Sequence, residues 1–465
     1  MRTKREQVQA YRFVTRRIVS AMVSDNPEAL ELPMRRTAIS AIVGAVIAAL
    51  IFGGFWVVGL IFPGGDWSTA KHDTILIDKN TGATYIYVGA QHVLFPTQNL
   101  VSAKLAFSDT VNDDDIEHVT TAELSKIPRA NKIGIAGAPD AIPGNDSLIK
   151  PTWQLCSAPV LENHKQRLSH IMLDRHPSGD TLIGDKRAAA VQDDDGKVYV
   201  LWHNKKLKTD TKVLTALELQ NPPQLVTKRF LAGIPQGPDL LVPNVKDAGS
   251  NAKIDGASVD NGQLARPTDG GDTYVVTGGH FAKIGKTMER MMRNKKGGES
   301  DPVSVDGDTI NANETDDFEP QSFPQAIPDS FDMNTDDSAV CATYKGTHTT
   351  LMVYRKTPKV INIFTGTSPD SADSNSGTVE HVTVPPTKGV LVHPQSSDAD
   401  TAGTMYVLTD TGVKYPLEGK AAELLGYTNS KAQNVSAALL DLVPEGPTLD
   451  PSKAKDGLPA SGKAG

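Results

Sequence analysis

Residues 37–62, TAISAIVGAVIAALIFGGFWVVGLIF, form a run of 26 residues without one charged side chain. About 20 consecutive apolar residues span the core of a bilayer, so this run predicts one tilted transmembrane helix. A cleaved signal peptide would have an apolar core of about 7–15 residues that ends in small residues. This run is longer, starts after 36 residues and ends in Ile61-Phe62-Pro63, which favours a membrane anchor.

The charges on the two sides of this run predict its orientation. Arg35 and Arg36 precede it, and no basic cluster follows it. The positive-inside rule therefore places residues 1–36 in the cytoplasm and residues 63–465 outside a single-pass cytoplasmic membrane anchor. The whole chain has a net charge of −8, although residues 1–36 carry eight basic and four acidic side chains. The outer part is therefore strongly acidic, which argues against nucleic-acid binding.

Two cysteines, Cys156 and Cys341, lie 185 positions apart. No CxxC motif or Cys/His cluster accompanies them, so the sequence predicts no zinc or iron–sulfur site. Thiols outside the cytoplasm oxidise readily, and we expect a Cys156–Cys341 disulfide that encloses the middle of the outer part. The alternative is two unrelated buried thiols.

Before the apolar run, residues 5–23 predict a basic amphipathic helix. Apolar side chains recur at spacings of three and four, and arginines occupy other positions around the helix. Such an arm can dock into a groove of a cytoplasmic partner, or it can lie on the anionic inner leaflet, and the sequence favours neither. Its residues are Val8, Tyr11, Val14, Ile18 and Met22 on the apolar side, with Arg12, Arg16 and Arg17 elsewhere.

Four stretches of the outer part share a strand–turn–strand pattern with a tyrosine near the start. Helical segments follow three of them, at 213–220, 287–293 and 421–427. We interpret each as a hairpin–helix repeat that buries its apolar face against its neighbours. The tyrosines that anchor the four repeats are Tyr85, Tyr199, Tyr274 and Tyr406.

Two repeats end in nearly the same phrase. Val226-x3-Phe230-Leu231-x2-Ile234-Pro235-x-Gly237-Pro238-x-Leu240 matches Val435-x3-Leu439-Leu440-x2-Val443-Pro444-x-Gly446-Pro447-x-Leu449 with a constant offset of 209. We interpret residues 133–144 as a looser third copy of this ending.

These patterns divide the outer part into segments. The stretch 297–337 carries twelve acidic residues and no Lys or Arg, and we interpret it as a solvated, mobile loop, because its spacing fits no EF-hand calcium site. The expected segments are a first repeat at 63–149, a central β-rich domain at 150–197 and 335–392, a second repeat at 198–250, a third repeat with the acidic loop at 251–334, a fourth repeat at 393–450 and a disordered tail at 451–465.

The stretch VVTGGHFAKIGKT, residues 275–287, resembles a phosphate-binding loop. In that motif four residues separate Gly from Gly-Lys-Ser/Thr, whereas five separate Gly279 from Gly285. The fourth repeat has Ala421 where Thr287 stands. We therefore expect a hairpin of two short strands over 273–284, with no phosphate-sized nest at its tip. GxSxG and HExxH are absent too, and we predict no catalytic, cofactor-binding or metal-binding residues.

The chain also resembles a known family, the EccB component of the type VII (ESX) secretion membrane complex of actinobacteria. The resemblance rests on segments spread in order over nearly the whole chain: KREQVQAYRF in the arm, PGGDW after the apolar run, TGATYIYV, LFPTQNLVSAKL, GIAGAPDAIP, WQLC, VPPTKGVLV, TDTGVKYPL and LVPEGPTLDP. The acidic stretch is a departure from the family and has no assigned role.

The resemblance implies an α+β fold with a short cytoplasmic helix, one transmembrane helix and an elongated extracytoplasmic domain of four repeats around a central β-rich domain. It implies a structural core subunit that needs no cofactor. The implied partners are the EccC ATPase, the channel-like EccD, EccE and a mycosin protease, together with other copies of its own outer domain. By analogy it leaves open a peptidoglycan-binding module and, because some members are called ATPases, a nucleotide hydrolase.

Overall fold

The computed structural model describes residues 4–24, 34–61, 73–111, 116–160, 163–174, 176–254, 256–293, 301–316, 318–320, 322–333, 336–362, 377–396 and 403–456. The rest of the predicted arm, acidic stretch and tail lies outside these residues. The chain divides into two units, residues 1–73 and residues 74–465, and each is described by itself.

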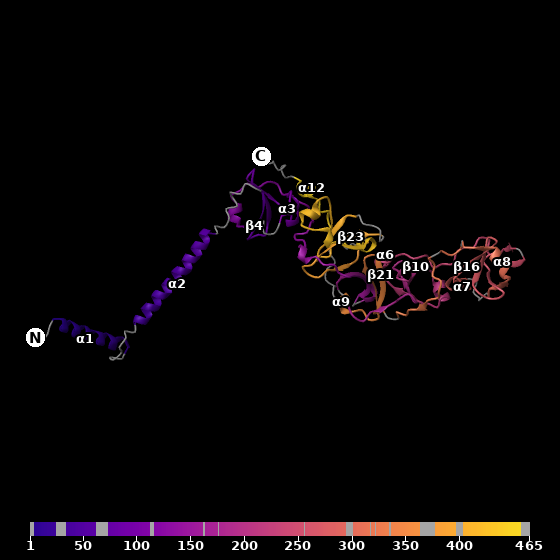
Figure 1. Cartoon of the computed structure of the whole chain (residues 1–465), viewed down its shortest axis with the longest axis horizontal. Coiled ribbons are helices and arrows are strands. Elements are labelled where there is room, and N and C mark those ends of the chain that lie inside the picture. The colour runs from indigo at the N-terminus through magenta and orange to yellow at the C-terminus, as the bar shows by residue number, and fades with distance from the viewer. Residues whose placement is uncertain are drawn as a thin grey trace. The chain divides into compact units, whose positions relative to one another are not determined.

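The first unit contains two helices, α1 (Lys4–Ser24) and α2 (Met34–Ile61) (Figure 1). Within α2, residues 37–57 have a mean hydropathy of 2.4, and among the described residues this is the one helix long and apolar enough to cross a membrane. Its 28 residues correspond to a length of about 42 Å, which exceeds the roughly 30 Å hydrocarbon core. The predicted amphipathic helix and the predicted span are both present as helices.

The second unit begins with a four-stranded sheet, called sheet 1. Three antiparallel strands are followed by helix α3, and the fourth strand, β4, then lies parallel to the first, β1, in the order β3-β2-β1-β4. The side chain of Asn99 caps α3 by accepting a hydrogen bond from the Ser102 amide at 2.8 Å. The elements are β1 (Thr74–Asp78), β2 (Thr84–Val88), β3 (Val93–Pro96), α3 (Leu100–Leu105), β4 (Ile116–Val119) and α4 (Thr121–Leu124).

Three further sheets repeat this strand order, with a helix before a fourth strand that is parallel to the first. Sheet 2 contains β8 (Arg187–Gln192), β9 (Val198–Trp202), β10 (Lys205–Thr209), α5 (Thr211–Ala216), β11 (Gln224–Leu225) and α6 (Lys228–Gly233). Sheet 3 contains β14 (Leu264–Pro267), β15 (Thr273–Thr277), β16 (His280–Ile284), α7 (Lys286–Arg293), β17 (Val303–Val305), α8 (Gly307–Ala312) and β18 (Glu314–Thr315). Sheet 4 contains β23 (Val390–Gln395), β24 (Met405–Leu408), β25 (Lys414–Leu417), α10 (Ala421–Leu424), β26 (Gln433–Ser436), α11 (Ala437–Leu440) and α12 (Pro451–Ala454).

A six-stranded central sheet joins two distant parts of the chain in the order β22-β6-β5-β20-β21-β7. Its elements are β5 (Trp153–Val160), β6 (Asn163–Leu173), β7 (Thr181–Leu182), β20 (Ala339–Lys345), β21 (His348–Tyr354) and β22 (His381–Thr383), with helix α9 (Lys359–Asn362) packed against β5. The remaining strands are the hairpin β12 (Asn251–Ile254) and β13 (Ala257–Asp260), and β19 (Asp329–Ser330), which pairs with β8. Short 3₁₀ turns occupy Asn145–Ser147 and Asn429–Lys431.

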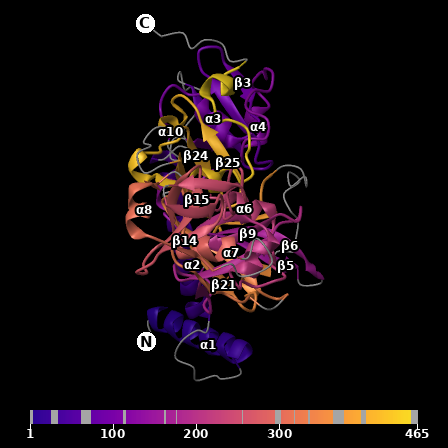
Figure 2. The same cartoon turned by 90° about the vertical axis from the view of Figure 1, so that its right-hand side faces the viewer.

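Shared apolar clusters show which sheets touch. One cluster joins the central sheet to sheets 2 and 4, a second joins sheets 2 and 3, and a third joins sheets 1 and 4. Figure 2 shows the last of these, with the yellow α10, β24 and β25 beside the purple α3 and β3. The two ends of the second unit therefore pack together, although they lie more than 300 residues apart in the chain.

The structure corrects the prediction for the acidic stretch. Its described residues 301–333 include the fourth strand and the closing helix of sheet 3, not a solvated loop. Apolar side chains alternate with the acidic ones, and Val305, Ile310, Phe323, Phe331 and Met333 are buried while many of the carboxylates remain exposed. The acidic side chains therefore lie on the exposed side of ordered segments whose apolar side chains are buried.

The copy of the closing phrase in sheet 1 also differs from the prediction. The Leu94 amide donates to Pro128 O at 2.9 Å, as the Lys206 amide does to Pro235 O and the Lys414 amide to Pro444 O. Residues 119–130 thus occupy the equivalent place, and the predicted 133–144 lies beyond it. Sequence reasoning missed this copy because Ala130 replaces the expected glycine and no second proline follows.

Four predicted boundaries differ as well. The first strand of each sheet precedes its tyrosine-bearing strand, so all of β8 belongs to sheet 2 instead of the predicted central domain. Strand β23 of sheet 4 begins at Val390, three residues before the predicted start of the fourth repeat. The predicted helix at 213–220 ends at Ala216, because Glu218 adopts a left-handed conformation with φ 55°. The start of the predicted tail is helix α12, capped by Asp450 and fixed by the buried Ala454 against sheet 1.

Candidate functional site

The stretch that resembles a phosphate-binding loop is a tight hairpin followed by a helix. Strands β15 and β16 cover residues 273–284, as predicted, and their five Cα pairs run from Thr273↔Ile284 to Thr277↔His280. Gly278 and Gly279 form the turn with φ values of 58° and 83°, which glycine adopts at no steric cost. Helix α7 then begins at Lys286.

The amino end of α7 is covered by the chain that follows sheet 3. A Glu319 carboxylate oxygen accepts a hydrogen bond from the Gly285 amide at 3.2 Å, and the Lys286 amide donates to Gln325 O at 2.9 Å. A helix amino end is the place where a phosphate would bind in a nucleotide loop. Here a carboxylate and a carbonyl of the protein itself fill that place.

Packing and hydrogen bonding explain why glycine and threonine occupy the first and third positions of the GKT triplet. An ideal Cβ on Gly285 would lie 2.4 Å from Gln325 Oε1 and 3.0 Å from Gln325 Cα, so only glycine fits. Thr287 is fully buried and donates to the Ala326 carbonyl at 2.6 Å. Its hydroxyl therefore faces the covering segment. Burial raises the pKa of Glu319, while hydrogen bonds from the Gln325 side chain and the Gly285 amide oppose this rise.

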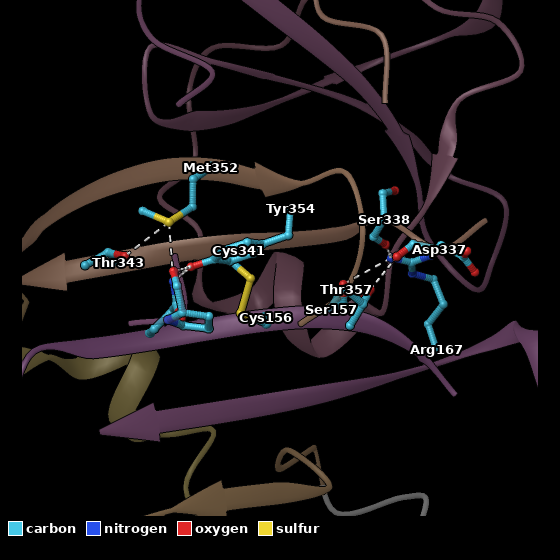
Figure 3. Close-up of a disulfide and its surroundings, with 12 residues drawn as sticks. Cys156, Ser157, Arg167, Asp337, Ser338, Cys341, Thr343, Met352, Tyr354 and Thr357 are labelled. Atoms are coloured by element: carbon cyan, nitrogen blue, oxygen red, sulfur yellow. Dashed lines mark hydrogen bonds between the residues drawn. A yellow bond between two sulfur atoms is a disulfide. The ribbon is translucent and has the colours of Figure 1, made fainter. Parts of the chain in front are cut away.

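The two cysteines form a disulfide, as the topology argument predicted. Cys156 on β5 and Cys341 on β20 are directly opposite each other in an antiparallel pair and are wholly buried (Figure 3). The same face of the sheet carries Met352, which accepts a hydrogen bond from Gln154 Nε2 at 3.3 Å. The bond closes a 185-residue loop that includes sheets 2 and 3.

A polar cleft of about 930 Å³ lies between sheet 2 and the segment that leads back to the central sheet. Arg167 lines it, but this guanidinium donates to the main-chain carbonyls of Ser157 and Ser338 (Figure 3). Burial lowers the pKa of Arg167 to about 10, and Asp336 opposes this shift. Arg167 therefore holds β6 to its neighbours. Among the described residues no group of three or more His, Cys, Asp or Glu side chains is placed to hold a metal ion.

On α1 the predicted arm residues are exposed on the helix surface. The exposed fractions of Tyr11 and Met22 are 75% and 83%, and Val8, Val14 and Ile18 are about half exposed. The Arg17 guanidinium lies 5.7 Å from the Phe13 ring, on a side that sequence analysis had not singled out. The repeat tyrosines occupy the second residue of β2, β9, β15 and β24.

Two lysines that sequence analysis missed occupy equivalent places in sheets 2 and 4. Lys206 Nζ donates to Leu231 O at 2.6 Å, and Lys414 Nζ donates to Leu440 O at 2.7 Å. These acceptors are corresponding residues of the two closing phrases. Burial lowers the pKa of both lysines. The sequence feature that could have revealed this contact was a lysine in the third strand of each of these two repeats.

Comparisons with known proteins identify a family for this chain. The sequence profile of the family described as "Type VII secretion system ESX-1, transport TM domain B" matches residues 1–460. The ESX-3 secretion system ATPase EccB3 of Mycobacterium tuberculosis is 27% identical over 496 residues, covering 97% of this chain and 88% of the relative. The ESX-5 secretion system ATPase EccB5 of the same species is 24% identical, covering 97% and 92%.

Two solved structures share the fold. A chain of an intact ESX-5 inner membrane complex superposes with a TM-score of 0.63 at 20% identity, covering 100% of this chain and 98% of that one. An EccB3 dimer from the ESX-3 core complex gives a TM-score of 0.60 at 23% identity, covering 82% and 99%.

Proposed function

The chain belongs to the EccB family of type VII secretion proteins, as a structural core subunit of the membrane complex, and we propose how its parts serve that complex. Helix α2 anchors the subunit in the cytoplasmic membrane with residues 1–36 inside and residues 63–465 outside. Arg35 and Arg36, in the first turn of α2 and before its apolar run, support this orientation.

The outer unit acts as an elongated scaffold. In this proposal sheets 1 to 4 are four copies of one unit. Their common strand order, the parallel fourth strand and, in three of them, a proline carbonyl that binds the third strand support it. Such copies present long surfaces for partners. We expect these surfaces to contact other copies of the outer unit, since a relative in the ESX-3 core complex is a dimer.

The observation that carries the docking role is the exposed apolar face of α1. Tyr11, Val14 and Ile18 lie on one side of a 21-residue helix, and the described part of the first unit leaves them exposed. Helix-in-groove recognition uses apolar anchors at this spacing. We propose that this face, flanked by Arg12 and Arg16, docks the cytoplasmic parts of the EccC, EccD or EccE components, and that a mycosin protease associates with the assembled complex.

Replacing Ile18 with glutamate is expected to reduce recovery of these components at least tenfold, because a charge on the buried face of a docked helix opposes burial. The measurement is co-purification through a tag at residue 465 in mild detergent. Gln9→Glu adds the same charge on the polar side of α1 and serves as the matched control.

Equal recovery with both variants would contradict the docking role. Loss of binding to anionic vesicles by Ile18→Glu, with the complex intact, would instead support an arm that lies on the inner leaflet.

We propose further that the subunit has no nucleotide site at 275–287, although relatives carry the name ATPase. The filled amino end of α7 and the engaged Thr287 hydroxyl support this. Lys286→Ala is expected to leave stability unchanged, because its side chain is exposed, and magnesium-dependent ATP turnover of the purified chain to stay at background. Gly285→Ala should lower the free energy of unfolding by about 1–3 kcal/mol through overpacking against Gln325.

Two measurements test this. ATP turnover is measured for the full natural chain and for Lys286→Ala in detergent, and urea unfolding is measured for both variants. Turnover in the natural chain that disappears with Lys286→Ala would overturn the proposal.

A further inference from the structure

Two histidines stack at one edge of the central sheet. His170 on β6 and His381 on β22 are paired residues of parallel strands, and their ring centroids are 5.0 Å apart at an interplanar angle of 24°. His170 is only 5% exposed and lies opposite Cys156 on the next strand. The two rings therefore sit side by side next to the buried disulfide.

The short segment 377–384, which carries His381 and is here called the strap, connects three parts of the second unit. The Val379 amide donates to Leu442 O of the sheet 4 closing phrase at 2.8 Å. Glu380 accepts from the Ser169 amide of the central sheet at 2.8 Å and pairs with Arg229 of α6 at 2.5 Å. An ideal Cβ on Gly412, in the β24–β25 turn, would lie 2.8 Å from Val382 O. Releasing the strap would therefore loosen sheets 2 and 4 from the central sheet.

We propose that the stacked pair His170 and His381 is a proton-sensitive latch, and that protonation of these rings releases the strap and loosens the junction of the central sheet with sheets 2 and 4. Neutral rings stack favourably, whereas two imidazolium rings at this distance repel each other. One of them would also carry its charge into a site almost closed to water.

The surrounding charges do little to support protonated rings. Glu380 is the carboxylate that interacts with His381, but it is held by Arg229 and by the Ser169 amide. The β5 neighbour of His170 is a disulfide, which does not titrate. Helix α9, packed on β5, adds the positive Lys359.

The sign of the pH dependence follows from these surroundings. Burial lowers the pKa of His170 to about 3, with His381 adding to the shift, and burial also lowers the pKa of His381, which Glu380 partly opposes. Both rings bind protons more readily when the strap is released, where the pKa returns to about 6.5. The latch is therefore fully effective above pH 6.5 and weakens as the pH falls below it.

Hydrogen exchange of the full chain in detergent tests this latch. Lowering the pH from 7.5 to 5.0 should raise the opening equilibrium of residues 379–384 about 30-fold for one titrating ring, and more if both rings titrate. After correction for the intrinsic pH dependence of exchange, amides of β15 and β16 in sheet 3 should change less than threefold. Equal protection of the strap at both pH values would overturn the proposal.

Three variants identify the responsible groups. His170→Phe with His381→Phe keeps two stacked rings without titration and should abolish the pH effect, whereas His348→Phe, at an exposed position on β21, should retain it. If the double variant fails to fold, His381→Asn should reduce the pH effect to that of one ring. A pH effect that keeps its full size in His381→Asn or persists in the double variant, but vanishes in Glu380→Gln, would assign the sensitivity to the carboxylate and refute the latch.

Discussion

Replacing Cys156 and Cys341 together with alanine is expected to lower the free energy of unfolding of the second unit by about 4 kcal/mol. The bond joins neighbouring strands of the central sheet, yet the loop it closes is 185 residues long and contains sheets 2 and 3. A loop of that length has a large chain entropy in the unfolded state, and the cross-link removes part of it. Urea unfolding followed by near-ultraviolet circular dichroism measures the change.

Reduction of the natural chain separates the bond from side-chain packing. Both sulfurs are wholly buried, so the double alanine variant also loses packing around Met352 and Ala158. The reduced natural chain loses only the bond and should retain slightly more stability than the variant. A double variant as stable as the oxidised chain would show that the unfolded state is already constrained in this region.

The parts of the fold that could be predicted from sequence are those with a local signal. The apolar run of α2, the spacing in α1 and the turn at Gly278-Gly279 each act within a few residues, and each predicted element is present. The fourth strands of the sheets were missed because strands such as β11, of two residues, and β17, of three, are too short for a period to show. Their pairing depends on a parallel partner distant in the chain.

The same distinction between local signals and distant contacts applies to the candidate sites. The disulfide could be inferred because only two cysteines exist, and the compartment decides their state. By contrast, the contact of Glu319 with the Gly285 amide spans 34 residues, and the Lys414 contact with Leu440 spans 26. Charged residues normally lie on solvated surfaces, so a partly buried carboxylate or a buried ammonium gives no pattern in the sequence.

The structure explains the closing phrase shared by sheets 2 and 4 through its packing. Its apolar residues from sheets 2 and 4, among them Phe230 and Leu439, belong to one buried cluster with Trp153 and Leu155 of the central sheet. Helices α6 and α11, which carry the two phrases, also touch each other. The two copies of the phrase therefore meet at one core, where their apolar residues pack against the central sheet.

Phe230→Ala is accordingly expected to lower the free energy of unfolding by about 4 kcal/mol, because it opens a cavity at the centre of this shared core. Phe230 is 0% exposed, and its amide is already bound by the Thr227 hydroxyl that caps α6. Leu225→Ala, five residues earlier and 46% exposed, is the matched control and should cost less than about 1 kcal/mol. Urea unfolding of the three proteins gives the comparison. Similar losses for both variants would mean that sheets 2 and 4 do not depend on this core for their attachment, and the phrase would then need another explanation.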